Sequence, residues 1–139
     1  MKAVSGMVVA VVLMIGFQTH AAETDAVSKA EESAKAWLAL VDAAKYAESW
    51  GSAATFFRGA VRESDWEQAV KSVRNPLGAL KSRKLKSATF ARSLPGVPDG
   101  EYVILQYYAQ FEHKATAIET VTPMLEPDGT WKVSGYYVK

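Results

Sequence analysis

The sequence predicts an α+β fold in which three N-terminal helices pack on a curved, four-stranded antiparallel sheet. Apolar residues recur with a period of about 3.6 up to Gly78, as on one face of a helix, and with a period of about two after it, as on one face of a strand. Turn-forming Gly, Pro and Asp residues divide this second half into four segments. A length of 139 residues suits one domain with a core of its own.

The first 21 residues have the pattern of a signal peptide. Lys2 precedes an apolar run over residues 7–17, and the small residues Thr19 and Ala21 place cleavage before Ala22. The run is shorter than the roughly 20 residues that a membrane-spanning helix needs, so an uncleaved anchor is the less favoured alternative. We therefore expect a single domain over residues 22–139, periplasmic or secreted, with no membrane contact after cleavage.

The first helix is predicted from about Ser28 to Ala44. Ser28 and Glu31 have the spacing of a capping box, in which each side chain binds a free backbone N–H group at the helix start. An apolar stripe follows at helical spacing and would face the core: Ala30, Ala34, Trp37, Leu38 and Val41.

Two more helices are predicted, over residues 46–61 and 64–75. The earlier one would bury a face formed by Tyr46, Trp50, Ala54, Phe57 and Val61. The later one would open with a second capping box, Ser64 and Glu67, and end before Pro76, because the residue preceding a proline is disfavoured in helical conformation. Its buried residues would be Trp66, Ala69, Val70 and Val73.

Four strands follow, predicted over residues 85–92, 101–112, 115–126 and 130–138. The breaks between them are a Pro- and Gly-rich stretch at 95–100, a tight reversal at His113 and Lys114, and a hairpin signal at 127–129. Pro123 cannot donate to a strand ladder, so the third strand is expected to have a bulge or an edge there.

Composition excludes several classes of protein. The chain has no cysteine, and His113 is the one histidine outside the leader, in a turn where exposure is expected; this argues against a metal site, a cofactor and a cysteine nucleophile. Without the leader, 15 basic residues balance 15 acidic ones, which does not suit nucleic acid. A basic cluster at residues 81–86 is interpreted as a solvated strand edge. We find no nucleophile elbow and no phosphate-binding glycine loop.

A series of short blocks resembles the bacterial DUF4019 family over nearly the whole mature chain. The blocks are Ala36–Asp42, Ser49-Trp50, Trp66, Arg74–Gly78, Ser82–Lys84, Pro98–Tyr102, Phe111, Lys114, Glu119–Val121 and Asp128–Tyr136. Ala44 departs from the pattern, because a glycine is expected after the first helix. The family name implies no activity. The layout also looks like the cone-shaped fold of nuclear transport factor two, ketosteroid isomerase and cystatin-like domains, which serves enzymes and binding modules alike.

Glu119 is the first candidate site residue. Strict alternation places it on one strand face with Ala117 and Val121, where a carboxylate in the mouth of a concave sheet could have a raised pKa. The alternative is that Glu119 pairs with a neighbouring arginine or faces solvent. The cations available to it are Arg74, Arg83 and Lys114. Arg83 could also hold a ligand carboxylate by two hydrogen bonds, or cap the third helix.

Tyr108 and Gln106 share a strand face and could present polar groups into a cavity, with Trp37 and Phe57 as its opposite wall. The other aromatic residues of the strands are expected in the core. Asp42 would end the first helix, where its charge opposes the helix dipole, so a local partner such as a backbone amide is expected.

Two functions from different classes fit these features. The first is a non-enzymatic module that binds a small amphipathic ligand or a protein partner on the concave sheet face. The second is a small isomerase-like enzyme without a cofactor, with Glu119 as general base and a tyrosine hydroxyl as oxyanion donor. A homodimer formed through exposed tyrosines of the sheet is a further possibility.

Overall fold

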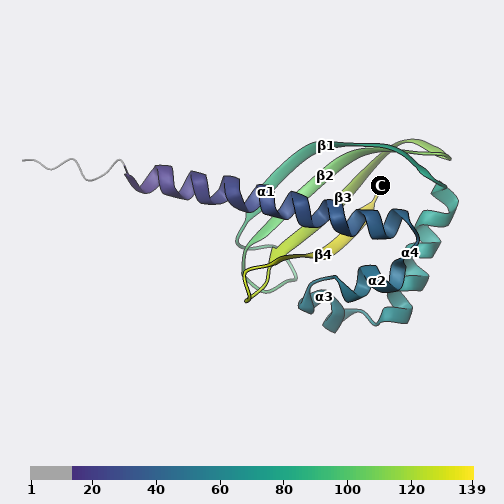
Figure 1. The fold of residues 1–139 in the computed structure, drawn as a ribbon, viewed down its shortest axis with the longest axis horizontal. Helices are drawn as coiled ribbons and strands as arrows, with labels where there is room; N and C mark the ends of the chain where they lie inside the picture. Colours follow the sequence, from purple (N-terminus) through teal and green to yellow (C-terminus); the bar gives the residue numbers. More distant parts are fainter. Residues whose placement is uncertain (1–13) are drawn as a thin grey trace, which may run out of the picture.

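Four helices precede four strands in the computed structural model, which describes residues 14–139, with side chains from residue 20 (Figure 1). The helices are α1 (Met14–Asp42), α2 (Tyr46–Gly51), α3 (Thr55–Ala60) and α4 (Glu63–Leu77). The strands are β1 (Leu80–Ala91), β2 (Tyr102–Phe111), β3 (Lys114–Leu125) and β4 (Trp131–Val138). The α+β class and the order of helices before strands are confirmed.

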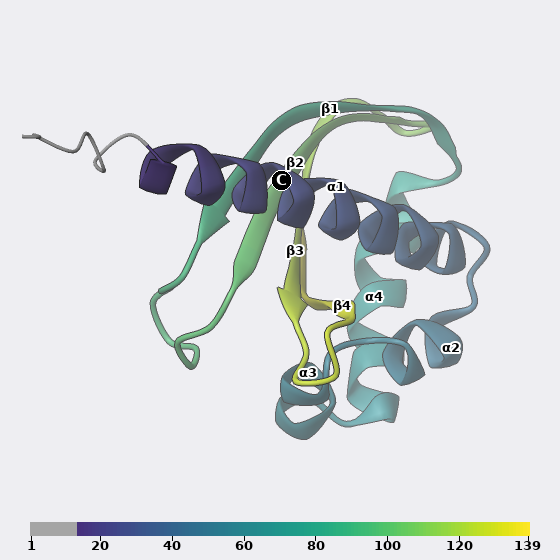
Figure 2. The same cartoon turned by 60° about the vertical axis from the view of Figure 1, so that its left-hand side comes forward.

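The strands form one antiparallel sheet in the order β1-β2-β3-β4. The sheet curves around α1, which crosses it and contacts all four strands, while α2, α3 and α4 lie together beside it (Figures 1 and 2). A register shift between Val121 and Pro123 confirms the bulge expected at Pro123 in β3. The concave face of the sheet is therefore the one that carries the helices.

The predicted stripe of α1 forms the centre of the core. Its residues Ala30, Ala34, Trp37, Leu38 and Val41 are all at most 3% exposed. They pack against inward-facing strand residues, among them Val103, Leu105, Val121 and Val133. This burial of apolar surface, at roughly 25 cal/mol per Å², is the main force that holds α1 on the sheet.

The predicted start of α1 is wrong. The helix begins at Met14, so Ser28 lies inside it and caps nothing. The predicted box at Ser64 is also wrong: the N-cap residue of α4 is Arg62, which makes no capping side-chain bond, and Glu63 and Asp65 place negative charge in the first turn instead. Within residues 14–139 no helix is long and apolar enough to cross a membrane. Residues 1–13 of the predicted signal peptide lie outside the described residues.

The single helix predicted over residues 46–61 is two helices. The N–H group of Ala54 bonds the carbonyl of Val133 in β4 at 2.8 Å, and the N–H group of Thr55 bonds the carboxylate of Glu126 at 2.8 Å. These two tertiary bonds replace helical ones, so the helix stops at Gly51 and a new one starts at Thr55.

Two details of α4 and one of β1 also differ from prediction. Ala69 and Val73 are exposed. The helix continues through Pro76 to Leu77, which packs against Phe111, and Gly78 closes it with φ 75°. β1 begins at Leu80, five residues before the predicted start, because Leu80 and its neighbours pair with the far end of β2.

Candidate functional site

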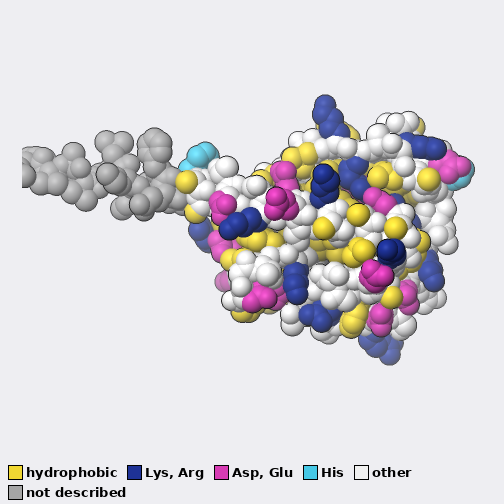
Figure 3. Space-filling model, viewed as in Figure 1, with side chains coloured by type: hydrophobic (Ala, Val, Ile, Leu, Met, Phe, Trp, Pro, Cys, Tyr) yellow, Lys and Arg dark blue, Asp and Glu magenta, His cyan; other side chains and the backbone are white. Residues whose placement is uncertain are grey.

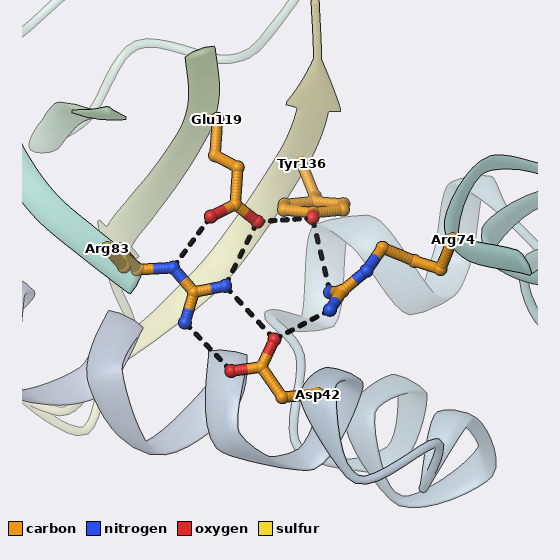
Figure 4. A network of polar contacts seen from close by, with 5 residues as sticks. All are labelled: Asp42, Arg74, Arg83, Glu119 and Tyr136. Carbon is orange, nitrogen blue, oxygen red and sulfur yellow. Dashed lines mark hydrogen bonds and ion pairs between the residues drawn. The ribbon is translucent and has the colours of Figure 1, made fainter. Parts of the chain in front are cut away.

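Five polar side chains from five elements meet between the helices and the sheet (Figure 4). They are Asp42 at the end of α1, Arg74 on α4, Arg83 on β1, Glu119 on β3 and Tyr136 on β4. We call this group the polar network. Glu119 is fully buried, Arg74 is 6% exposed and Arg83 15% exposed, while Asp42 reaches solvent with 24% of its side chain.

Arg83 is the centre of the polar network. Its Nε bonds Glu119 Oε1 at 2.6 Å and its Nη2 bonds Glu119 Oε2 at 3.1 Å. On the other side, Nη1 and Nη2 bond the two oxygens of Asp42 at 2.8 and 3.0 Å. One guanidinium thus makes two-pronged contacts with two carboxylates, which is the geometry that arginine suits best.

Arg74 and Tyr136 complete the polar network. Arg74 Nη2 bonds Asp42 Oδ1 at 2.8 Å, its Nη1 lies 3.4 Å from the Tyr136 hydroxyl, and its guanidinium stacks over the Phe111 ring. The Tyr136 hydroxyl donates to Glu119 Oε2 at 2.5 Å. Arg74 Nε is buried without a hydrogen-bond partner among the described residues.

The strand pattern explains why these groups meet. Arg83 lies opposite Ala109, which lies opposite Ala117, so small residues beside it leave room for the guanidinium on the inward face. Glu119 lies two residues further along β3 on the same face. Asp42, the last residue of α1, contacts Arg83 on the side of the guanidinium that faces away from Glu119 (Figure 4).

Pairing within the polar network fixes the protonation states. Burial acts to raise the pKa of Asp42, but hydrogen bonds from Arg83 and Arg74 outweigh it and hold that pKa below its ordinary value. Burial, together with the Glu119 charge, raises the pKa of Tyr136, so its hydroxyl stays protonated and can donate. With Tyr136 protonated, the formal charges of the polar network are two positive, on Arg74 and Arg83, and two negative, on Asp42 and Glu119.

The hydrogen bonds of the polar network connect α1 and α4 to the sheet. They also leave neither oxygen of Glu119 without a hydrogen-bond donor. Both Glu119 oxygens accept bonds from Arg83, and one also accepts from Tyr136. The pairing of Glu119 with an arginine, one of the two alternatives raised by the sequence, is what the structure contains. The Glu119 carboxylate is also fully buried, so every contact that the described residues show for it is internal to the fold.

Three of the six candidate residues lie outside the polar network. Lys114 is exposed at the start of β3, opposite Phe111, with no contact to Glu119. Tyr108 and Gln106 lie on the face of the sheet that points away from the helices, so the prediction that they face Trp37 and Phe57 is wrong. In β2 it is the odd-numbered residues, such as Tyr107, that point inward.

We call the outward face of the sheet the open face. Among the described residues no helix or loop covers it around Tyr108, over parts of β1, β2 and β3. Tyr108 is 53% exposed and Tyr137 60% exposed. At the other end the loop after β1 folds over the sheet, so that Tyr102 is buried and its hydroxyl bonds the Pro98 carbonyl. The described residues thus leave only one end of this face open.

A hollow of about 540 Å³ lies on the open face. One row of residues crosses it from strand to strand: Lys84 pairs with Tyr108, Tyr108 with Ile118, and Ile118 exchanges two backbone bonds with Lys139. The remaining lining residues are Ser82, Ala109, Gln110, Ala115, Thr116 and Ala117. A concave, largely apolar surface with a few polar groups is the usual form of a small-molecule site.

Sequence reasoning missed two members of the polar network and two residues of the hollow. The core position expected for Tyr136 is confirmed for its ring, which packs against Trp37 and Trp66, but the bond of its hydroxyl to Glu119 is not predicted. The local backbone partner expected for Asp42 is wrong, because its partners Arg74 and Arg83 are 32 and 41 residues away. The solvated edge expected at Lys84 is confirmed, since Lys84 is exposed on the edge strand β1, but the sequence does not predict that Lys84 and Lys139 line a hollow. The sequence signal that could have identified Lys84 is the alternation of β1 and β2. Once the register of the two strands is known, that alternation places Lys84 beside Tyr108 on the same face.

Among residues 14–139 no group of three or more His, Asp or Glu side chains could hold a metal ion. No curated protein matches the chain. A family model described as "Protein of unknown function (DUF4019)" matches residues 33–136, which include every member of the polar network and most of the hollow. The chain therefore belongs to the DUF4019 family.

Proposed function

We propose that the protein is a non-enzymatic, exported module that binds a small amphipathic molecule on the open face of its sheet. The observation that carries the proposal is the hollow of about 540 Å³, which has apolar side chains at its centre and polar groups at its margin. Its size lies within the range of roughly 300–1,000 Å³ typical of small-molecule sites. The concave face, where the sequence placed the ligand, is filled by α1 and its packed side chains.

Export is supported by the signal-peptide pattern of residues 1–21. It is also supported by the exposure of the side chains of α1 next to the expected cleavage point. His20 and Ala21 are exposed, and within residues 20–42 of α1 the first buried side chain is that of Ala26, which comes after the expected cleavage point. Cleavage before Ala22 would therefore remove no side chain that is buried in the described part of the chain.

The isomerase-like alternative has no observation in its favour. It requires a carboxylate that is free to accept a proton from a substrate, and Glu119 is enclosed by Arg83 and Tyr136 without exposure. The two exposed tyrosines, Tyr108 and Tyr137, lie on the open face, outside the polar network.

Native mass spectrometry tests the proposal on protein purified gently from its own source. We expect a defined extra mass on the wild type that is lost from the Tyr108→Ser/Ile118→Ser variant. The matched control is Val73→Ser, which removes an apolar side chain that is 43% exposed on α4, and it should keep the extra mass. An extra mass retained by both variants would contradict a site on the open face. A wild type that carries no extra mass would contradict the binding of a small molecule.

A further inference from the structure

The four strands contain only one acidic residue, and it points inward. That residue is Glu119; the remaining strand positions are apolar, polar without charge, or basic. Because the mature chain balances its charges, the acids must lie elsewhere, and the helix-bearing side indeed carries acidic and basic side chains interspersed (Figure 3). The strands therefore contribute positive charge and no negative charge to the open face.

The positive charge lies next to the apolar centre of the hollow. Lys84 on β1 is directly opposite Tyr108, and Lys86 Nζ is 5.8 Å from the centre of the Tyr108 ring. Lys139 lies at the other end of the same row, beside Ile118. Among the described residues neither Lys84 nor Lys86 forms an ion pair with a carboxylate side chain, so their charges are available to a ligand.

From this arrangement we infer that the hollow takes a soluble, single-chain anionic amphiphile, such as a fatty carboxylate. The anionic head lies between Lys84 and Lys86, and the apolar body lies across Tyr108 and Ile118. This inference rests on the proposed function and specifies its ligand. A concave hollow suits one bound molecule better than the flat surface of a bilayer, which would contact only the rim.

The charge of the head is tested with three probes that share one apolar chain. The full-length protein is titrated by calorimetry with decanoate, decanol and decyltrimethylammonium. We expect decanoate to bind at least about ten-fold more tightly than decanol, a difference of about 1.4 kcal/mol, and decyltrimethylammonium to bind more weakly still. Equal binding of all three would overturn the anionic class and leave the site on the open face standing.

Variants locate the head. Lys84→Glu should weaken decanoate binding at least about ten-fold, whereas Lys84→Arg should keep it within about two-fold. Lys71→Glu is the matched control, since it makes the same charge change at an exposed position on α4 and should leave binding unchanged. Circular dichroism checks that each variant folds. A loss of binding in Lys71→Glu equal to that in Lys84→Glu would show a long-range charge effect and overturn the assignment.

Two other outcomes separate this inference from the proposed function. If phosphatidylglycerol vesicles bind the protein through Lys84 and decanoate does not bind, the face docks on a membrane and the inference is wrong. If none of the probes binds, yet native mass spectrometry finds a mass that depends on Tyr108 and Ile118, the inference fails and the proposed function stands.

Discussion

Glu119 shows how a residue that a sequence offers as a candidate base can be paired with an arginine in the fold. Its alternation with Ala117 and Val121 was predicted correctly, because β3 has small or apolar residues at those positions and the parity is unambiguous. Strand alternation does not show which side chain binds the Glu119 carboxylate. Arg83 is 36 residues away, and only the β1–β2–β3 register brings the two together.

Replacing Glu119 should be costly because its partners stay buried. Glu119→Leu leaves Arg83 Nε and the Tyr136 hydroxyl without their acceptor, so we expect the free energy of unfolding to fall by about 3–5 kcal/mol. Glu32→Leu, at an exposed position of α1, should change it by no more than about 0.5 kcal/mol. Urea unfolding measures both. A Glu119→Leu variant as stable as the control would show that the polar network contributes nothing to the fold.

Asp42 should make stability depend on acid pH. In the unfolded chain Asp42 titrates near 3.8, and in the folded protein its hydrogen bonds to Arg83 and Arg74 lower its pKa despite burial. Between the two pKa values the unfolded state binds more protons, so the Asp42 contribution is complete above about pH 4 and is lost as pH falls through the folded pKa. The stability advantage of the wild type over Asp42→Asn, measured by urea unfolding, should be smaller at about pH 2 than at about pH 7. An equal advantage at both would be the contrary result.

At the scale of elements, the sequence predicted which segments are helices and strands better than where they begin and end. The apolar stripe of α1 and the strand alternation are averaged over many residues, so they tolerate local exceptions. A boundary depends on one or two hydrogen bonds. The break between α2 and α3 arises from the bond of Ala54 to Val133, 79 residues away, and Pro76 stays helical where Leu77 packs on Phe111. Neither partner is visible from the local sequence.

The turns after α1 and α4 both contain a residue with positive φ, and a Cβ atom is unfavourable at each of them. Removing the Cβ at Ala44 should therefore stabilise the protein, and adding one at Gly78 should destabilise it. Ala44 follows α1 with φ 59°, the one positive φ of a non-glycine residue in the described part of the chain. A side chain in this conformation costs about 1–2 kcal/mol, so Ala44→Gly should raise the free energy of unfolding by about 1 kcal/mol. The glycine expected at this position from the family pattern therefore has a physical reason.

Gly78, after α4, is the opposite case. It has φ 75°, and a Cβ there would lie 2.8 Å from His113 Cδ2 and 3.0 Å from Glu112 Cβ. Gly78→Ala should therefore lower the free energy of unfolding by about 2 kcal/mol. Denaturant titration of Ala44→Gly, Gly78→Ala and the wild type measures the three free energies of unfolding. If both variants changed the free energy of unfolding in the same direction, this explanation of the two turns would be wrong.

At the scale of the whole molecule, the face of the sheet that the helices cover is not predictable from the strand pattern alone. β2 carries aromatic and aliphatic residues on both of its faces, so the alternation of β2 alone does not show whether Tyr107 or Tyr108 faces the helices. The structure assigns Tyr107 to the inside, where burial raises its pKa to about 12, and Tyr108 to the open face. Consequently the candidate residues separate into two groups, a polar network that joins helices to sheet and an open face that remains available for a ligand.

The long first helix allows the boundary of the folded unit to be tested. Figure 1 shows that the first turns of α1 extend beyond the edge of the sheet, and among the side chains described from residue 20 onward the first buried one is that of Ala26. A chain of residues 22–139 should therefore unfold with a free energy within about 0.5 kcal/mol of the full-length value. A chain that starts at Glu31 also lacks Ala26, Val27 and Ala30, which pack in the core, and it should lose at least about 2 kcal/mol. If the shorter deletion were as destabilising as the longer one, residues before Ala22 would belong to the folded domain, and their removal by a signal peptidase would not be compatible with this fold.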